Sequence, residues 1–152
     1  MKVVLILIAM IFLAGCTSKP NAILAGHASD LKSHQRFGVC YGYACNTYQK
    51  TGLNDQEWNA VRKLFLFEAV SAKQERNRIA KAVALIEQFV GPKTGTDNDK
   101  ARAPIVNFNI KTEMDCIDEA TNSTTYLYLL RQDGLITYHT LGAKLRRNWY
   151  NF

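Results

Sequence analysis

The stretch SAKQERNRIAKAVALIEQFVGP, residues 71–92, carries the clearest structural signal in the chain. Its larger apolar residues recur at three- and four-residue intervals and so share one side of a helix: Ile79, Val83, Ile86 and Val90. Ser71 can cap the first turn, and the pair Gly91–Pro92 is typical of a helix end. The stretch therefore predicts an amphipathic helix over 72–90 with one buried side.

Helical patterns also lie on both sides of this stretch. Asn54 and Glu57 have the spacing of a capping box at the start of a helix predicted over 55–70. Asp115 is a suitable N-cap for a third helix, predicted over 116–132. Both segments carry apolar residues at helical spacing, so each is expected to bury one side.

The remaining patterned segments favour extended structure. Residues 135–141, LITYHTL, are rich in β-branched and aromatic side chains, which predicts a strand. Residues 105–111 offer a partner strand, and residues 37–48 predict an extended segment or tight loop at the start of the fold. The expected fold is therefore α+β, with three helices followed by a short antiparallel sheet.

The N-terminus predicts an export signal. A basic start at residues 1–2 precedes an uncharged apolar run at 3–13, which is about half the length that a membrane-spanning helix requires. The sequence LAGC at 13–16 resembles the bacterial lipoprotein signal, or lipobox. That resemblance implies cleavage before Cys16 and a diacylglyceryl group on its sulfur, and additional acyl chains would make the attachment lasting.

This resemblance also predicts how the chain is divided into segments and where in the cell the protein is located. We expect a signal peptide at 1–15, a lipidated cysteine with a polar tether at 16–37, and one α+β domain at 38–152, incomplete at its C-terminus. Because Thr17 rather than Asp follows the cysteine, the resemblance favours the periplasmic face of the outer membrane in a Gram-negative cell. The expected partners are the membrane, through the N-terminal lipid, and an envelope protein.

Composition and charge limit the other function classes. With 47% hydrophobic and 21% charged residues, the chain is neither disordered nor fibrous. Its formal charge of +6 and pI near 9.2 are typical of proteins that bind nucleic acid. The predicted export argues against nucleic acid as a partner, and attraction of the positive charge to anionic lipid is the simpler explanation. The partial phosphate-loop and calcium-loop motifs at 91–99 are incomplete, so we expect no cofactor and no metal.

The predicted lipid attachment determines how many cysteines are available for disulfides. If Cys16 carries the lipid, three cysteines are left for the domain, in a compartment that permits disulfides. Cys40 and Cys45 are close enough in sequence to form a local disulfide. Cys116 is then the odd cysteine, and it is buried and inert, paired with another chain, or reactive.

Cys116 is also the one candidate nucleophile. Three segments resemble an uncharacterised family of bacterial exported proteins with a transglutaminase-like or papain-like cysteine arrangement: Met114–Leu127, Tyr43–Cys45 and 79–96. That resemblance implies a transglutaminase-like fold shortened at its C-terminus, with Cys116 at the nucleophile position. His139 would be the base, and because no Asp or Glu follows it, the orienting residue would be Asn148, Asn151 or a residue beyond Phe152.

Two functions are therefore predicted as alternatives. The first is a membrane-anchored envelope lipoprotein with a non-catalytic binding or structural domain, in which Tyr41, Tyr43 and Tyr48 form a contact surface. The second is a cysteine-dependent amide hydrolase or acyltransferase, in which Cys116 attacks a carbonyl and His139 accepts the proton.

Overall fold

The computed structural model describes residues 33–99 and 112–142. Along this part the elements are β1 (Phe37–Tyr41), β2 (Thr47–Thr51), α3 (Asp55–Lys63), α4 (Ala72–Thr94), a short 3-10 turn η1 (Thr96–Asn98) and α5 (Cys116–Gln132). Several predicted features lie outside the described residues: the leader at 1–15, the lipid-bearing Cys16, the partner strand at 105–111, and Asn148 and Asn151.

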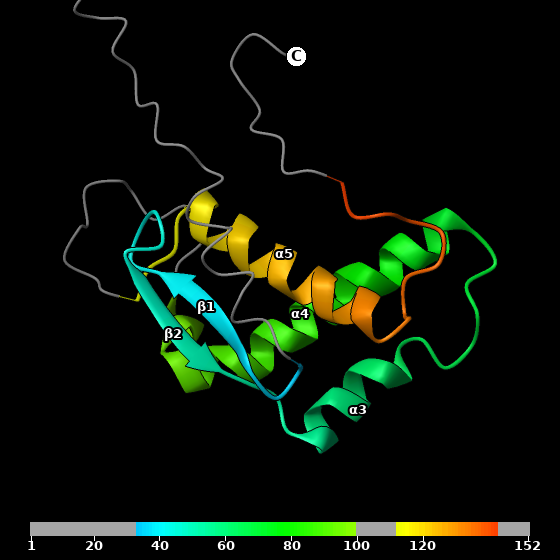
Figure 1. Ribbon diagram of the computed structural model, residues 1–152, viewed down its shortest axis with the longest axis horizontal. Coiled ribbons are helices and arrows are strands. Elements are labelled where there is room, and N and C mark those ends of the chain that lie inside the picture. Colours follow the sequence, from blue (N-terminus) through cyan, green and yellow to red (C-terminus); the bar gives the residue numbers. More distant parts are fainter. Residues whose placement is uncertain (1–32, 100–111, 143–152) are drawn as a thin grey trace, which may run out of the picture.

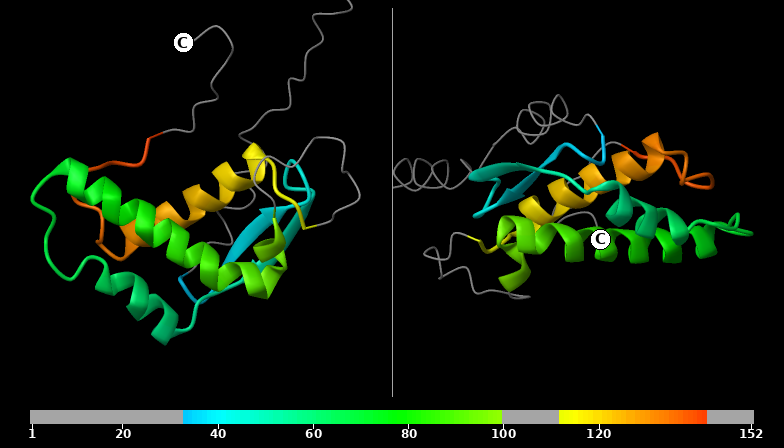
Figure 2. Two further views of the ribbon diagram at one scale, coloured as in Figure 1. Left: turned by 180° about the vertical axis from the view of Figure 1, so that it is seen from behind. Right: turned by 90° about the horizontal axis from the view of Figure 1, so that it is seen from below.

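The fold class is α+β, as predicted, but the predicted order is wrong because the sheet precedes the helices (Figure 1). β1 and β2 form a two-stranded antiparallel hairpin in which Phe37 pairs with Thr51 and Tyr41 with Thr47. Seen from below, α4 runs along one side of the molecule, with α5 and the hairpin on the other side (Figure 2). The hairpin therefore packs onto the helices at one end of the molecule.

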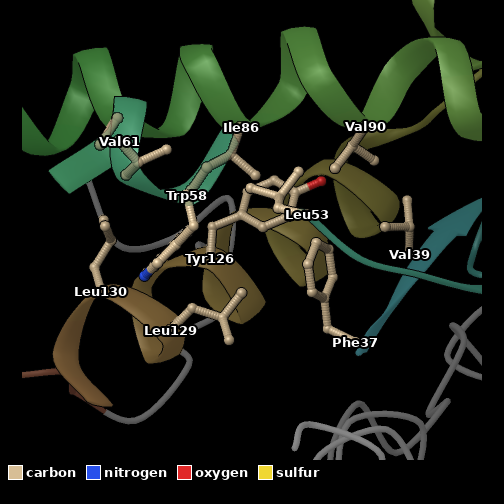
Figure 3. Close-up of a cluster of buried hydrophobic side chains, with 11 residues drawn as sticks. Phe37, Val39, Leu53, Trp58, Val61, Ile86, Val90, Tyr126, Leu129 and Leu130 are labelled. Carbon is tan, nitrogen blue, oxygen red and sulfur yellow. The ribbon is translucent and has the colours of Figure 1, made fainter. Parts of the chain in front are cut away.

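The hydrophobic core lies where β1, α3, α4 and α5 meet (Figure 3). Each element contributes fully or almost fully buried side chains: Phe37 and Val39 from β1, Trp58 and Val61 from α3, Ile86 and Val90 from α4, and Tyr126, Leu129 and Leu130 from α5. The rings of Phe37 and Tyr126 meet edge to face, with centroids 6.0 Å apart. Phe37 and Val39 lie on the same face of β1, because side chains alternate along a strand, and this face of the hairpin closes the core.

The folded part begins earlier than the predicted tether at 16–37 allows. Ser33 and Arg36 already form an isolated bridge, and the amide of Leu53 donates to the His34 carbonyl at 2.7 Å. The tether prediction is therefore wrong for its last residues, because Phe37 supplies apolar surface that the core requires.

The capping predictions for α3 and α5 are confirmed. Asn54 accepts from the amide of Glu57 while the Glu57 carboxylate accepts from the amide of Asn54. The same reciprocal pair joins Asp115 and Asp118 at the start of α5, which spans the predicted residues 116–132. Each cap satisfies backbone N–H groups that a helix end leaves unpaired.

The predicted helix over 55–70 is too long, because α3 ends at Lys63 and a loop follows. Two contacts from α4 hold this loop in a non-helical course. The Arg78 guanidinium donates to the carbonyl of Phe67, and the amide of Val70 donates to the Gln74 side chain at 2.8 Å. These bonds replace the helical ones, so the apolar residues at the end of the predicted helix form a loop instead.

The predicted end of the second helix at Gly91–Pro92 is also wrong, because α4 continues through both residues to Thr94. The chain stops instead at Gly95, whose φ of 79° is left-handed and whose amide donates to the Gly91 carbonyl at 2.7 Å. A Cβ at position 91 would lie 3.0–3.1 Å from Asp97, so the glycine there permits close packing against η1.

We predict that Gly52→Ala destabilises the domain. A Cβ at position 52 would lie 1.9 Å from the carbonyl oxygen of Gln35, and this backbone cannot retreat without straining the Leu53–His34 hydrogen bond. The expected loss is about 1–3 kcal/mol in the free energy of unfolding, measured by urea denaturation. Gly142→Ala is the matched control, because a Cβ there meets nothing within 4 Å. Equal stability of the two variants would contradict the prediction.

Candidate functional site

The structure separates the two predicted catalytic residues. Cys116 is the first residue of α5, whereas His139 belongs to the segment that follows Gln132 and continues from the other end of that helix (Figure 1). A helix of 17 residues is about 25 Å long at its usual rise per residue. The geometry therefore does not bring the Cys116 thiol within proton-transfer distance of the His139 ring.

Cys116 is exposed, so the interpretation of this residue as a small buried cysteine is wrong. The inward face of α5 at this end carries Asp118 and Asn122, both fully buried. Positions 115, 118 and 122 share one helical face, and position 116 points away from it. The thiol is accessible to solvent, and none of the hydrogen bonds described at this end of α5 joins it to a base.

His139 belongs to a different cluster, centred on the carboxylate of Glu75 in α4. Glu75 is only 1% exposed, yet it sits in the first turn of α4 and faces inward. Its two oxygens accept from the backbone amides of Thr137, Tyr138 and His139 at 2.8–3.0 Å, and from the Thr137 hydroxyl at 2.8 Å. The Nδ1 atom of His139 lies 2.8 Å from Glu75 Oε1. We call these four residues the Glu75 cluster.

The Glu75 cluster explains why the predicted strand over 135–141 is wrong. Three successive amides that a strand would offer to a neighbouring strand converge here on one carboxylate. A buried charge of this kind is tolerated only when hydrogen bonds replace its hydration. The segment is therefore irregular, and it is fastened to α4.

Hydrogen bonding also determines the charge state of Glu75. Burial by itself raises the pKa of Glu75, but the bonds from the Tyr138 amide, the His139 ring and Thr137 outweigh it and lower the pKa to about 2. Glu75 is therefore ionised at neutral pH. Nδ1–H of His139 can then donate to it, which leaves Nε2 facing the guanidinium of Arg76 at 3.3 Å.

A hollow of about 460 Å³ lies beside the Glu75 cluster. The α3–α4 loop forms one wall, through Phe65 and Phe67, and the segment after α5 forms another, through Leu135 and Tyr138. Arg78 also lines it. The hollow is thus bordered by apolar side chains, the Arg78 guanidinium and the carboxylates of Glu68 and Glu75, at the end of the molecule opposite the hairpin turn.

The hairpin turn forms a second polar centre. Cys40 and Cys45 are joined as a disulfide, with Cα atoms 4.6 Å apart. Between them the chain takes left-handed backbone angles at Gly42, and also at Tyr43, Ala44 and Cys45, with φ between 55° and 66°. Side chains rarely adopt this conformation, so the surrounding structure must hold the turn in place.

Three polar residues on one face of α5 hold this turn. Asp118 accepts from the amides of Tyr43 and Cys45 at 2.9 and 2.6 Å, and Asp115 accepts from the amide of Ala44 at 3.0 Å. Burial raises the pKa of Asp118, the hydrogen bonds from the amides of Asp115 and Cys45 lower it, and the charge of Asp115 raises it, so that the net shift is upward. The third residue, Asn122, bonds both the amide and the carbonyl of Cys40, at 2.7 and 2.8 Å.

The hairpin turn also contains a group of potential metal-ligand atoms. Within the described residues, the sulfur atoms of Cys40 and Cys45 and a carboxylate oxygen of Asp118 lie within 4.8 Å of one another. The sulfur atoms are bonded to each other, and the Asp118 oxygens accept backbone amides. The arrangement is accounted for by the turn that it holds.

The predicted tyrosine contact surface is half-buried rather than exposed. The Tyr41 hydroxyl donates to Gln49 at 2.7 Å, and the Tyr48 ring lies across Gly38, where a Cβ would meet it at 1.9–2.1 Å. Tyr43 is half-buried within the left-handed turn. These side chains therefore contribute mainly to the packing of the hairpin.

Comparisons with known proteins find no match to the chain among protein-family models, curated proteins or solved structures. Among the helices described, none has the length and apolarity to cross a bilayer. The resemblances noted from the sequence therefore stay predictions.

Sequence reasoning missed Glu75, Asp118 and Asn122 as organising residues. Glu75 lies at helical spacing from the buried positions Ala82 and Ile86, on the inward side of α4. A charged residue on the inward side of an amphipathic helix is the signal that could have identified it.

We predict that Glu75→Gln lowers the free energy of unfolding by about 2–3 kcal/mol at pH 7, because a carboxamide offers one acceptor oxygen to donors that a charged carboxylate satisfies with two. The folded pKa of about 2 lies below the ordinary 4.5, so the ionised carboxylate stabilises the fold fully above pH 4.5. That stabilisation is lost as pH falls from 4.5 towards 2, and the difference between wild type and variant should shrink over this range. Urea unfolding at several pH values measures it. A difference that is constant with pH would refute the role of the charge.

Proposed function

We propose that this protein is an envelope lipoprotein whose folded part is a non-catalytic binding or structural domain. The single observation that carries the non-catalytic part is the separation of Cys116 and His139 at opposite ends of α5. His139 is moreover engaged by Glu75 through Nδ1 and faces Arg76 through Nε2. Its ring fastens the segment after α5 to α4.

Two further observations support the exported, lipid-anchored part of the proposal. The lipobox-like LAGC at 13–16 supplies a cysteine at the position where lipid is attached. The disulfide between Cys40 and Cys45 suits an oxidising compartment, because such bonds are rare in a reducing cytosol. Under this proposal the lipid holds the protein to the membrane, and the domain is presented on its surface.

The alternative is a cysteine-dependent amide hydrolase or acyltransferase. It is favoured by one observation, the exposure of the Cys116 thiol at the first residue of α5. It would require a base other than His139. We therefore place it second.

We predict that Cys16 carries lipid when the full chain is expressed in a bacterial host. Labelling with an alkyne fatty acid should mark the wild type, and mass spectrometry should find the chain cut before Cys16. Cys16→Ala should lose the label and the cut, whereas Cys116→Ser should retain both. An uncut chain with an unmodified Cys16 would refute the lipid anchor.

We predict that the Cys116 thiol of the native protein reacts with iodoacetamide at the rate of an ordinary exposed thiol such as glutathione. A catalytic thiolate would react on the order of tenfold faster or more near neutral pH. His139→Gln should leave the rate unchanged, with urea unfolding as the control for folding. A fast reaction that slows in His139→Gln would support the hydrolase instead.

A further inference from the structure

Most of the exposed large apolar side chains of the described residues gather at one end of the molecule. Leu66, Phe67 and Val70 lie in the α3–α4 loop and are 70%, 80% and 81% exposed. Tyr138, 53% exposed, borders the same hollow as Phe67. We call these four residues the apolar loop patch. Apolar side chains grouped in this way commonly mark an interaction site.

The apolar loop patch is held in position by polar contacts. Arg78 donates to the Phe67 carbonyl, and Gln74 accepts from the Val70 amide. The amide of Tyr138 donates to Glu75, which fixes its backbone beside the loop. The apolar side chains therefore project from a fastened backbone instead of folding into the core.

Basic residues lie beside the apolar loop patch: Lys63 borders the same hollow as Leu66, and the Arg78 guanidinium donates to the Phe67 carbonyl. Between positions 63 and 81 the chain has five basic residues and two acidic ones, a formal charge of +3: Lys63, Lys73, Arg76, Arg78 and Lys81 against Glu68 and Glu75. The Glu75 carboxylate is buried and hydrogen-bonded to the amides and the ring of the Glu75 cluster, so it is not part of the exposed surface. Glu68 is the one exposed acid among residues 63–81, so the exposed side chains of this stretch carry an excess of positive charge.

We propose that the apolar loop patch docks onto the surface of a bilayer that contains anionic lipids. Apolar tips with basic residues beside them match an interface in which acyl chains lie below negative phosphates. The inference rests on the proposed lipid attachment in one respect, because the attached chain keeps the domain at the membrane and so lets a weak docking surface act. Docking would fix the orientation of the domain, with the hairpin turn directed away from the bilayer.

The test uses the full chain, processed and lipidated in a bacterial host and reconstituted into vesicles of phosphatidylcholine with or without phosphatidylglycerol. A nitroxide is attached at Phe67→Cys in a Cys116→Ser background, so that the introduced thiol is the reactive one. Gln88→Cys, at an exposed position on α4, is the matched control. Power saturation then compares relaxation by oxygen, which enters the bilayer, with relaxation by a water-soluble nickel chelate.

We expect the label at position 67 to be shielded from the nickel chelate on vesicles that contain phosphatidylglycerol, while the label at position 88 stays accessible. Leu66→Ser combined with Val70→Ser, in the Phe67→Cys protein, should lower the docking equilibrium constant on the order of a hundredfold, since each large apolar side chain contributes roughly a factor of ten. These exposed positions should leave the unfolding curve unchanged. Lys63→Gln and Lys73→Gln should each weaken docking roughly fivefold, and added salt should weaken it in the same direction.

Each other outcome overturns the proposal. A label at position 67 that stays as accessible as the one at 88 excludes docking, and equal shielding on both vesicle types excludes the anionic lipid as partner. Shielding that also appears in detergent solution and grows with protein concentration assigns the patch to a second copy of the chain. Failure of the lipid anchor is distinguishable, because the protein would then not be recovered with the vesicles after carbonate washing.

Discussion

The two hydrogen bonds between the Asn122 amide and the backbone of Cys40 connect the hairpin to the helices, and the rest of the fold depends on them. A two-stranded hairpin is marginal on its own. Here the side chain of a helix residue satisfies the amide and the carbonyl of a fully buried strand residue, where a third strand would otherwise be needed. With β1 fixed in this register, Phe37 reaches Tyr126 and closes the core.

The same helix face holds the turn of the hairpin, and this contact determines which way the Cys116 side chain points. Asp115 and Asp118 accept the amides of the left-handed turn while they cap α5, so the turn and the helix start stabilise each other. Their carboxylates also complement the positive end of the helix dipole. Because this face is committed to the hairpin, Cys116 is turned outward, and its exposure follows from the packing of its neighbours.

What the sequence could predict was local. The N-caps of α3 and α5, Asn54 and Asp115, each accept the amide three positions further on, and both N-caps are predicted from the sequence alone. The segment 135–141 shows the opposite case, since its strand-like composition lost to a carboxylate more than sixty positions earlier in the chain. Such a long-range polar contact leaves no periodic signal. The candidate site failed for the same reason: Cys116 and His139 were paired by residue type, and the structure places a whole helix between them.

The Glu75 cluster also determines where part of the apolar loop patch lies. A buried carboxylate that collects three amides is costly to assemble and is stable only as a unit, because removing one partner leaves the others unsatisfied. The cluster therefore fixes the backbone of residues 137–139, and with it the position of Tyr138 beside the α3–α4 loop. An apolar surface gains most in binding when its backbone is ordered beforehand, since less conformational entropy is lost on contact. The polar cluster inside the molecule thus determines the shape of the apolar surface outside it.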